Sequence, residues 1–449
     1  MMNWRKILGS QRKTGGESVY NDPLRSPFET DFDRIIFSHP FRRLQDKTQV
    51  HPLPEQDFVH TRLSHSLEVS SVGRSLGKYT GKIIIDRNPE LKKDYNPHDF
   101  GAIVAAASLT HDIGNPPFGH SGEEAISDFF KFHDLGKEIH KIVDEVQWLD
   151  LTNFEGNAQG FRILNSPLYQ GLSLTFATLA AFSKYPRPSH ADKENGRKSH
   201  KKFGYFQSEK AIFRSLAEEL ELLPAAVGMD SWSRHPLTFL VEAADDICYG
   251  IIDLEDGCRL GLLSYKETEE LLSPIIGAKF DPRKLEKYKN KEERIGLLRA
   301  MAIGQLIEEC TEAFLGHEKA LLTADFDKAL TNVIPSNVFL EEIAKVSLER
   351  IYRAPKVVET ETVGYEVLPG LLEVIVGAVF QKFNDPSKLS GRQKSIMRLI
   401  PEFHVLDIEQ NKGNLYLQML ACTDFVSNMT DSAALSFYRK IKGIDLPKG

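Results

Sequence analysis

Apolar residues recur at steps of three and four along most of the chain, which is the spacing of one buried face of an α-helix. The pattern predicts helices over 62–85, 99–112, 123–132, 207–222, 236–256, 292–323, 336–351, 365–382 and 409–430. Strand-like alternation is scarce, and the best candidates for it are 356–359 and 366–368. We therefore expect an all-α protein that contains at most a short β-hairpin.

Two segments are expected to be loops. Residues 8–30 are polar and interrupted by Gly and Pro, and residues 185–205 are basic with turn residues throughout. Neither a repeat nor a convincing linker is visible. We expect an N-terminal arm over 1–35, a helical core over 36–275, and a helical C-terminal region over 276–449 that packs on the core.

Composition narrows the class of protein without deciding it. The 449 residues are 41% hydrophobic, enough to bury one large core or two ordinary ones. The formal charge of −7 argues against a surface coated for nucleic acid, although a local basic pocket remains compatible. The cysteines, Cys248, Cys258, Cys310 and Cys422, lack CxxC spacing, so neither a disulfide framework nor a thiolate metal site is indicated.

The chain also lacks the usual targeting signals. The first residues, MMNWRK, are not followed by the apolar run of a signal peptide. No apolar stretch is expected to approach the roughly 20 residues that a membrane helix needs. We expect a soluble, cytoplasmic protein.

The segment HDIGNPPFGHSGE, residues 111–123, holds several metal-binding and proton-handling side chains. It follows the apolar, small-residue run 102–109, which is typical of a buried helix. A His–Asp pair at the end of a buried helix is costly unless it has partners or a metal ion. Pro116 and Pro117 should break the chain direction, and Ser121 is expected to cap the helix that follows.

Further potential ligands lie on other predicted helices. His65 lies near the start of one, three residues after Arg62 and therefore on the same face. The apolar segment 239–249 contains two adjacent carboxylates, Asp245 and Asp246. A His, a His–Asp pair and a distant Asp can converge on one divalent ion. Each residue alone would more often be an ordinary core or surface group, but their joint pattern favours a metal site.

Several sequence blocks resemble the bacterial dGTP triphosphohydrolases of the HD-domain superfamily. They are FRRLQDKTQV at 41–50, HDIGNPPFGH at 111–120, FEGNAQG at 154–160 and AADDI at 243–247. The blocks fall within about 30–260, and the segment 351–365 extends the likeness. The resemblance implies that 36–275 is an HD-domain catalytic core and that 276–449 contributes to oligomer contacts.

The resemblance also implies a ligand set and a catalytic pair. The metal would be held by His65, His111, Asp112 and Asp245, with Asp246 pointing elsewhere because consecutive helical residues diverge. Mg²⁺ or Mn²⁺ is favoured, and Fe, Co or Zn would also suit imidazole and carboxylate ligands. His120 would be the catalytic histidine and Glu123 would tune or orient it. Its spacing is also compatible with a simpler role, in which the Glu123 carboxylate near the start of a helix interacts favourably with the helix dipole.

Substrate contacts follow from the same resemblance. Residues matching phosphate contacts are Arg62, Asn157, Lys184 and Tyr185, and those matching nucleoside contacts are Gln49, Val50, Tyr249 and Asp253. Asp245, Tyr249 and Asp253 form one stripe of a helix, at i, i+4 and i+8. Asp253 would accept the sugar 3′-OH, and Tyr249 would crowd out a ribose hydroxyl. Lys201 and Lys202 are weaker phosphate candidates, because exposed lysines usually only aid solubility.

The implied reaction is metal-dependent hydrolysis of a deoxynucleoside triphosphate at the α-phosphate, giving deoxynucleoside and tripolyphosphate. dGTP is the favoured substrate. The alternatives are an HD-domain phosphohydrolase with broader dNTP or other nucleotide substrates, and a dNTP- or single-stranded-DNA-binding protein with little turnover. A homo-oligomer, for instance a hexamer, and contact with single-stranded DNA are the implied partnerships. Base preference, the proton donor and any second nucleotide site near 352–365 stay open.

Overall fold

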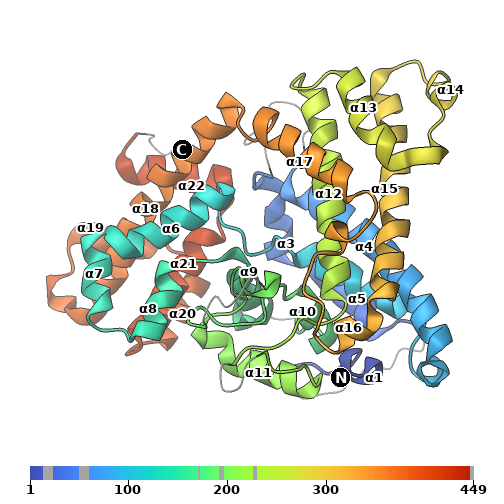
Figure 1. Ribbon diagram of the computed structural model, residues 1–449. Helices are drawn as coiled ribbons and strands as arrows, with labels where there is room; N and C mark the ends of the chain where they lie inside the picture. The colour runs from blue at the N-terminus through green and yellow to red at the C-terminus, as the bar shows by residue number, and fades with distance from the viewer. Residues whose placement is uncertain (14–23, 50–59, 170–171, 192–196, 226–229, 445–449) are drawn as a thin grey trace.

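The computed structural model describes residues 1–13, 24–49, 60–169, 172–191, 197–225 and 230–444 (Figure 1). Within these ranges the regular structure is helical, and β-pairing is limited to isolated bridges such as that between Thr48 and Thr61. The predicted all-α class is confirmed. The hairpin considered at 356–359 and 366–368 does not form, because both segments belong to the long helix α18 (Pro355–Asn384).

The helices pack into two hydrophobic units. The first unit contains α1 (Trp4–Ile7), α2 (Pro27–Ile36), α3 (His39–Arg43), α4 (Arg62–Arg87), α5 (Pro97–Thr110), α10 (Phe176–Phe182), α11 (Lys210–Glu219), α12 (Thr238–Arg259), α13 (Tyr265–Ile276), α14 (Pro282–Leu285), α15 (Lys291–Gly316), α16 (Glu318–Leu322) and α17 (Asn337–Arg350).

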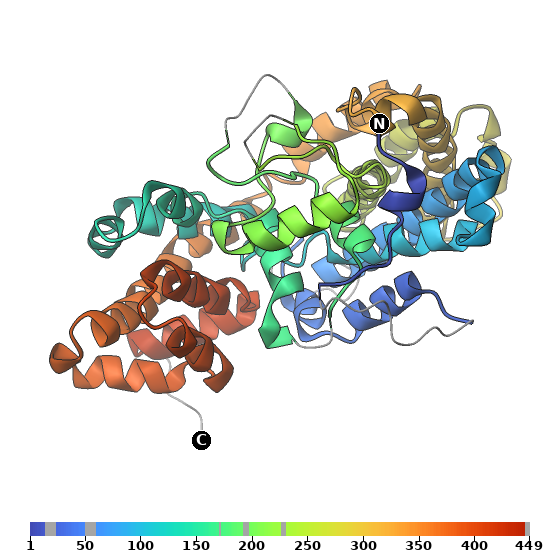
Figure 2. The same ribbon diagram turned by 90° about the horizontal axis from the view of Figure 1, so that it is seen from below.

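The second unit contains α6 (Gly119–Phe132), α7 (Asp134–His140), α8 (Glu145–Thr152), α18, α19 (Gly391–Leu399), α20 (Glu402–Gln410), α21 (Leu415–Ser427) and α22 (Asp431–Lys442). Figure 2 shows these C-terminal helices gathered on one side of the molecule, next to α6–α8. α9 (Gly156–Asn165) places Ala158 in the second unit and Phe161 in the first. The packing units therefore interleave along the sequence.

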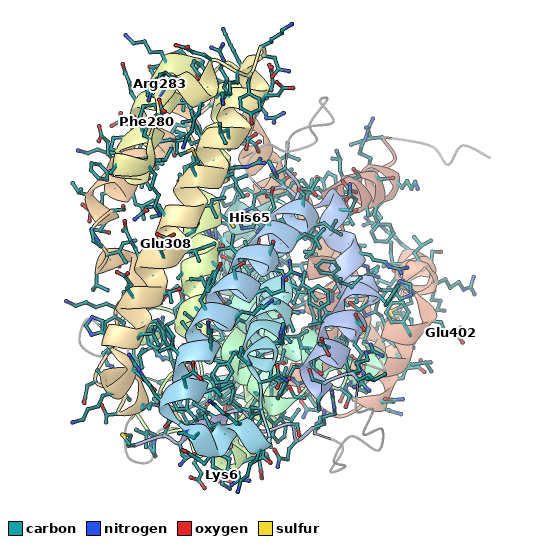
Figure 3. All side chains as sticks on the ribbon, turned by 90° about the vertical axis from the view of Figure 1, so that its right-hand side faces the viewer. Lys6, His65, Phe280, Arg283, Glu308 and Glu402 are labelled. Atoms are coloured by element: carbon teal, nitrogen blue, oxygen red, sulfur yellow. The ribbon has the colours of Figure 1, made fainter. Side chains whose placement is uncertain are left out.

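In the first unit, α4 and α5 approach each other very closely. A Cβ at Gly77 of α4 would lie 2.6 Å from the carbonyl oxygen of Phe100, and one at Gly81 would lie 2.6 Å from the Phe100 ring. Glycine at these positions lets the two backbones meet, which a larger residue would prevent. α12 packs against both helices, and Figure 3 shows α4, where His65 is labelled, beside α15. This layer carries the three segments that bear the expected ligands.

Most predicted helices are confirmed with small shifts at their ends. Residues 292–323 divide into α15 and α16, and the predicted 409–430 helix is interrupted by a turn before α21. The expected loop at 185–205 is partly buried, with Arg187 and Tyr205 in the interior. The cysteines are free, as expected from their spacing.

α18 is more apolar than any segment expected from the sequence. Its residues Val357–Asn384 are long and hydrophobic enough to cross a membrane by length and composition. The expectation that no segment reaches this threshold is therefore wrong. Half of its most apolar window is buried inside the protein, against α6, α21 and α22. α18 thus serves as the central core helix of the second unit.

Candidate active site

Three potential metal ligands from different helices meet at one point. His65 belongs to α4, His111 follows the last residue of α5, and Asp245 belongs to α12. Nε2 of each histidine lies 3.3 Å from Oδ1 of Asp245, and the three ligand atoms all lie within 4.8 Å of one another. This spacing is compatible with a single ion bound between them.

The tautomer of His111 is set by the backbone. The carbonyl oxygen of Ser108 lies 2.8 Å from Nδ1 of His111, and because a carbonyl only accepts, Nδ1 must carry the proton. In the neutral imidazole Nε2 carries a lone pair, and this buried atom makes no hydrogen bond to a described residue, although Oδ1 of Asp245 lies 3.3 Å away. Such a hydrogen bond on the far nitrogen is what orients a metal-binding histidine.

Asp245 is held in its ionised form. Burial raises the pKa of this carboxyl, but Lys184 and the two neighbouring histidines lower it more, so the pKa lies well below its usual value. Nζ of Lys184 lies 2.7 Å from Oδ2 of Asp245. Oδ1, on the side of the histidines, remains available as a ligand.

Asp112 lies beside this cluster with both oxygens engaged. Nη1 of Arg62 donates to its Oδ2 at 2.5 Å, and Nδ2 of Asn115 donates to its Oδ1 at 2.6 Å. Oδ2 also lies 3.6 Å from Nε2 of His111. Burial raises the pKa of Asp112, but the charges of Arg62 and the two histidines lower it by more, so the carboxyl is ionised. Its role as a fourth ligand stays a prediction.

Asp246 faces the other side of α12. Its Oδ2 accepts a hydrogen bond from the Thr331 hydroxyl at 2.6 Å, in the short helix η7 (Leu330–Asn332). Burial, with the nearby Glu242, raises the pKa of Asp246 to about 6. Asp246 is therefore not part of the cluster around His65.

The turn before α6 differs from the one predicted. The helix begins at Gly119, after Phe118 and with both residues in the left-handed region at φ 63° and 64°. Ser121 does not cap the helix: it lies within the first turn, and its hydroxyl donates to the Phe118 carbonyl at 2.8 Å. The expected cap is wrong because Phe118 takes the N-cap position, three residues before Ser121.

This turn places a histidine–carboxylate pair at the cleft. Nδ1 of His120 lies 2.8 Å from Oε2 of Glu123, and Oε1 of Glu123 accepts the Gly156 N–H at 2.8 Å. The bond to Glu123 raises the pKa of His120. Burial raises the pKa of Glu123, but its bond to His120 and the charge of Lys202 lower it more. An exposed imidazole is thus held by a buried, ionised carboxylate.

One cleft of about 440 Å³ joins these groups. The predicted site residues that line it are Gln49, Arg62, His111, Asp112, His120, Glu123, Asn157, Lys184, Tyr185, Lys202, Asp245 and Tyr249. His65 is buried beneath its floor, and Val50 lies outside the described residues. Asp253 and Lys201 are not among the lining residues. Lining residues that sequence reasoning missed include Thr48, Asn115, Tyr352, Val357 and Glu361.

The wall of the cleft formed by α12 and the segment before α18 contains a pair of tyrosines. The rings of Tyr249 and Tyr352 stack with centroids 5.4 Å apart, and both line the cleft. The Tyr352 hydroxyl donates to Oδ2 of the buried Asp253 at 2.6 Å. Burial raises the pKa of Asp253 to about 7. Tyr352 thus stands between the open cleft and the carboxylate expected to read the sugar.

Comparison with known proteins identifies the family of the chain. The HD domain family model matches residues 62–154, which contain His65, the His111–Asp112 pair, His120 and Glu123. The chain is 40% identical to a deoxyguanosinetriphosphate triphosphohydrolase-like protein of Synechocystis, covering 99% of this chain and 100% of that one.

It is also 30% identical to the deoxyguanosinetriphosphate triphosphohydrolase of Klebsiella pneumoniae, over 99% of this chain and 98% of that one. The chain belongs to the deoxyguanosinetriphosphate triphosphohydrolase family. A similar protein of Pseudomonas aeruginosa, named triphosphohydrolase-like, is 38% identical over 99% of this chain. Family and HD domain together support a phosphohydrolase.

In this family member, the start of α4 is fixed by His60. Its Nδ1 lies 2.8 Å from Oδ1 of Asp256, and its Nε2 lies 3.3 Å from Oε1 of Glu68. Burial lowers the pKa of His60, but the bonds to Asp256 and Glu68 outweigh it and raise the pKa from 6.5 to about 10. The imidazolium is therefore part of the framework that holds Arg62 and His65.

We expect His60→Gln to destabilise the protein in a pH-dependent way. A histidine whose pKa is raised on folding contributes its full stabilisation of the folded state at pH values below its unfolded pKa, here 6.5. This contribution is lost as the pH rises towards about 10. The loss at pH 6 should be about 1.5–3 kcal/mol, typical of hydrogen bonds to charged groups. Thermal unfolding across this pH range measures it, with the exposed His98→Gln as control. A constant difference at all pH values would contradict the prediction.

Proposed function

We propose that the protein hydrolyses a deoxynucleoside triphosphate, with dGTP as the favoured substrate, to deoxynucleoside and tripolyphosphate. The observation that supports this most directly is one cleft that joins the His65–His111–Asp245 cluster, three cationic side chains and the His120–Glu123 pair. The unpartnered Nε2 of His111 and the ionised Asp245 suit a divalent cation. Held there, with Asp112 alongside, Mg²⁺ or Mn²⁺ would supply a Lewis acid for the α-phosphate.

Arg62 and Lys184 would bind phosphate oxygens. Each lines the cleft and is paired with one carboxylate, Asp112 and Asp245 respectively. A triphosphate would share these cations, since charged hydrogen bonds to phosphate are strong. As water adds to the α-phosphorus and O5′ leaves, the same groups would neutralise charge on the phosphate oxygens that the tripolyphosphate keeps. Lys202, 3.2 Å from Oε1 of Glu155, adds positive charge on the other side of the cleft.

The His120–Glu123 pair would move the protons. Hydrolysis to tripolyphosphate breaks the bond between the α-phosphorus and the sugar O5′, and the oxygen of water joins that phosphorus. The attacking water loses a proton and O5′ gains one. His120 can serve either step because its imidazole reaches the open cleft while Glu123 fixes the Nδ1 proton.

The sugar would bind against Tyr249, in a position that leaves no room for a ribose 2′-hydroxyl. Asp253 would take the 3′-OH together with the Tyr352 hydroxyl that already bonds to it. Oε1 of Gln49, buried in the cleft wall without a partner among the described residues, is a further acceptor for the nucleoside. A site built from such groups discriminates strongly against substrates that leave them unpaired.

Glu361 offers a reason for preferring guanine. It lines the cleft from α18, and a carboxylate accepts hydrogen bonds only. Guanine presents adjacent N1–H and N2–H donors, and adenine does not. We expect Glu361→Gln to lower kcat/KM for dGTP relative to dATP by about tenfold or more, the value of one charge-assisted bond. Competition between the two substrates measures this, with exposed Glu359→Gln on the same helix as control. An unchanged ratio would remove Glu361 from base selection.

The reaction itself is tested by product analysis. Purified protein is incubated with each dNTP and either Mg²⁺ or Mn²⁺ in ¹⁸O-water, and products are separated by ion exchange. The expected products are deoxyguanosine and tripolyphosphate, with the label in tripolyphosphate. Release of dGMP with pyrophosphate, or of dGDP with phosphate, would contradict the proposal. Nucleotide binding without hydrolysis under every metal would instead favour a binding protein.

A further inference from the structure

A buried carboxylate of the last helix joins two separate segments of the cleft. Asp431 is the first residue of α22 and is 2% exposed. Its Oδ2 accepts the Thr48 N–H at 3.0 Å and the Thr48 hydroxyl, and its Oδ1 accepts the Phe118 N–H at 3.0 Å. One side chain therefore accepts hydrogen bonds from two backbone amides that lie 70 residues apart in the sequence.

Each of these two amides lies close in the sequence or by hydrogen bonds to residues that take part in the proposed reaction. Thr48 precedes Gln49 and bridges to Thr61, and the N–H of Arg62 donates to the Lys47 carbonyl at 3.2 Å. Asp431 thus holds the strip that carries Gln49 and Arg62. On the other side, Phe118 is the residue before Gly119 and two before His120.

The Phe118 turn needs an external partner. A bulky residue in the left-handed region is disfavoured by about 1–2 kcal/mol and persists only where its surroundings hold it. Phe118 adopts φ 63°. Two hydrogen bonds stabilise this conformation. The Phe118 N–H donates to the Asp431 carboxylate, and the Ser121 hydroxyl donates to the Phe118 carbonyl. The conformation of this turn decides where His120 points.

A second charged side chain ties the same corner to the metal cluster. Nζ of Lys47 is buried and donates to the carbonyl of Asn115 at 2.5 Å and to that of Ser427, in α21, at 2.9 Å. Asn115 in turn donates to Asp112 at 2.6 Å. Burial lowers the pKa of Lys47 to about 7 although Asp431 counteracts it. The α21–α22 corner is thereby fixed to both halves of the cleft.

We propose that Asp431 is a positioning residue for the phosphohydrolase site, setting the His120 turn against the Gln49–Arg62 strip. The proposal rests on the proposed function for its kinetic consequence only. Asp431 is neither a member of the ligand cluster nor a lining residue of the cleft, and it acts through the lining residues Thr48 and Phe118. Its effect should therefore fall on turnover and substrate binding rather than on metal affinity.

The matched control is Asp424, a second buried carboxylate of the same region. It lies in α21 and accepts from Arg162 at 2.9 Å and from Gln159 at 2.8 Å, both on α9 and both off the cleft. Asp424 also joins the C-terminal helices to the rest of the chain. Asp424→Asn therefore reproduces the loss of a buried linking carboxylate without loosening Phe118 or Thr48.

The first measurement needs no substrate. Hydrogen exchange of peptides covering 115–123 is followed in wild type, Asp431→Asn and Asp424→Asn. An Asn side chain offers one acceptor oxygen in place of two, so the Phe118 and Thr48 amides cannot both be retained. We expect exchange in 115–123 to accelerate by about tenfold or more in Asp431→Asn only. Equal protection in wild type and Asp431→Asn, or equal loss in both variants, would overturn the inference.

The second measurement is a double-mutant cycle on turnover. Asp431→Asn should lower kcat by about 10–100-fold, as small misplacements of catalytic groups do, with Mn²⁺ affinity unchanged within about twofold. In a His120→Ala background the same change should add little, because its effect passes through His120. Additive losses, or a loss equal to that of Asp424→Asn, would overturn it. A wild type inactive on every dNTP would refute the proposed function, and exchange at 115–123 would still decide the role of Asp431.

Discussion

Asp245→Asn is expected to abolish metal binding and turnover, whereas Asp246→Asn should leave both nearly intact. Asp245 contributes the oxygen that lies 3.3 Å from both histidine Nε2 atoms, and Asp246 bonds to Thr331 on the far side of α12. A neutral amide also loses the charge that attracts the cation. The loss of Mn²⁺ affinity should exceed about 100-fold, more than is typical for an outer-sphere partner.

Calorimetric titration with Mn²⁺ and Mg²⁺ measures the affinity, and chelation followed by readdition of metal tests the dependence of turnover. The two variants differ by one position in the same helix, so each controls for the helix packing of the other. Loss of metal from the Asp246 variant alone would show that the ligand assignment is wrong. Turnover that survives chelation would remove the metal from the mechanism.

His120→Ala should lower kcat by about 10²–10⁴-fold, the usual contribution of a positioned acid or base. The imidazole is exposed and makes no contact with the ligand cluster, so metal affinity and the unfolding temperature should change little. Steady-state kinetics with dGTP, alongside a metal titration, separates these effects. A variant with near-normal kcat would exclude His120 from proton transfer.

Glu123→Gln distinguishes the two roles of that histidine. The Glu123 bond raises the pKa of His120, so its removal should move that pKa downward. If protonated His120 donates to O5′, the alkaline limb of the kcat/KM profile shifts to lower pH. If neutral His120 accepts a proton from water, the acid limb shifts to lower pH instead. A profile that does not move would show that another group titrates.

The sequence pattern was sufficient for α4 and α12, which were predicted within a few residues although each packs against several other helices. Apolar residues recur at helical spacing along nearly the whole of both segments. α18 was only partly recognised: its N-terminal valines favour extended structure locally. Burial of Val367, Leu368 and Leu371 against α6 and α21 decides the outcome in the fold. Propensity is a weak guide where long-range packing dominates.

The candidate site could be predicted as far as its motifs reached. His65, His111 and Asp245 are signalled by polar residues inside apolar helices, and the structure brings them together. Tyr352 and Glu361 lie in the segment 351–365 that extends the family likeness, but a Tyr or a Glu in isolation gives no sign that it lines a cleft. Glu361 reaches the cleft from α18 of the second packing unit, and Tyr352 reaches it from the turn before α18, where it packs against the first unit. The role of Asp431 could not be predicted from the sequence. Its partners are the backbone amides of Thr48 and Phe118 and the Thr48 hydroxyl, and no sequence pattern identifies such contacts.

The interleaving of the two packing units limits how far the chain can be shortened. The HD domain match ends at residue 154, yet α6 within it buries its apolar face on α18 and its first turn is held from α22. A fragment that stops at the end of the match would expose that face to water and release Phe118. The HD stretch is thus a signature of the chemistry and not an excisable module, and a minimal enzyme designed from this chain would have to keep α22.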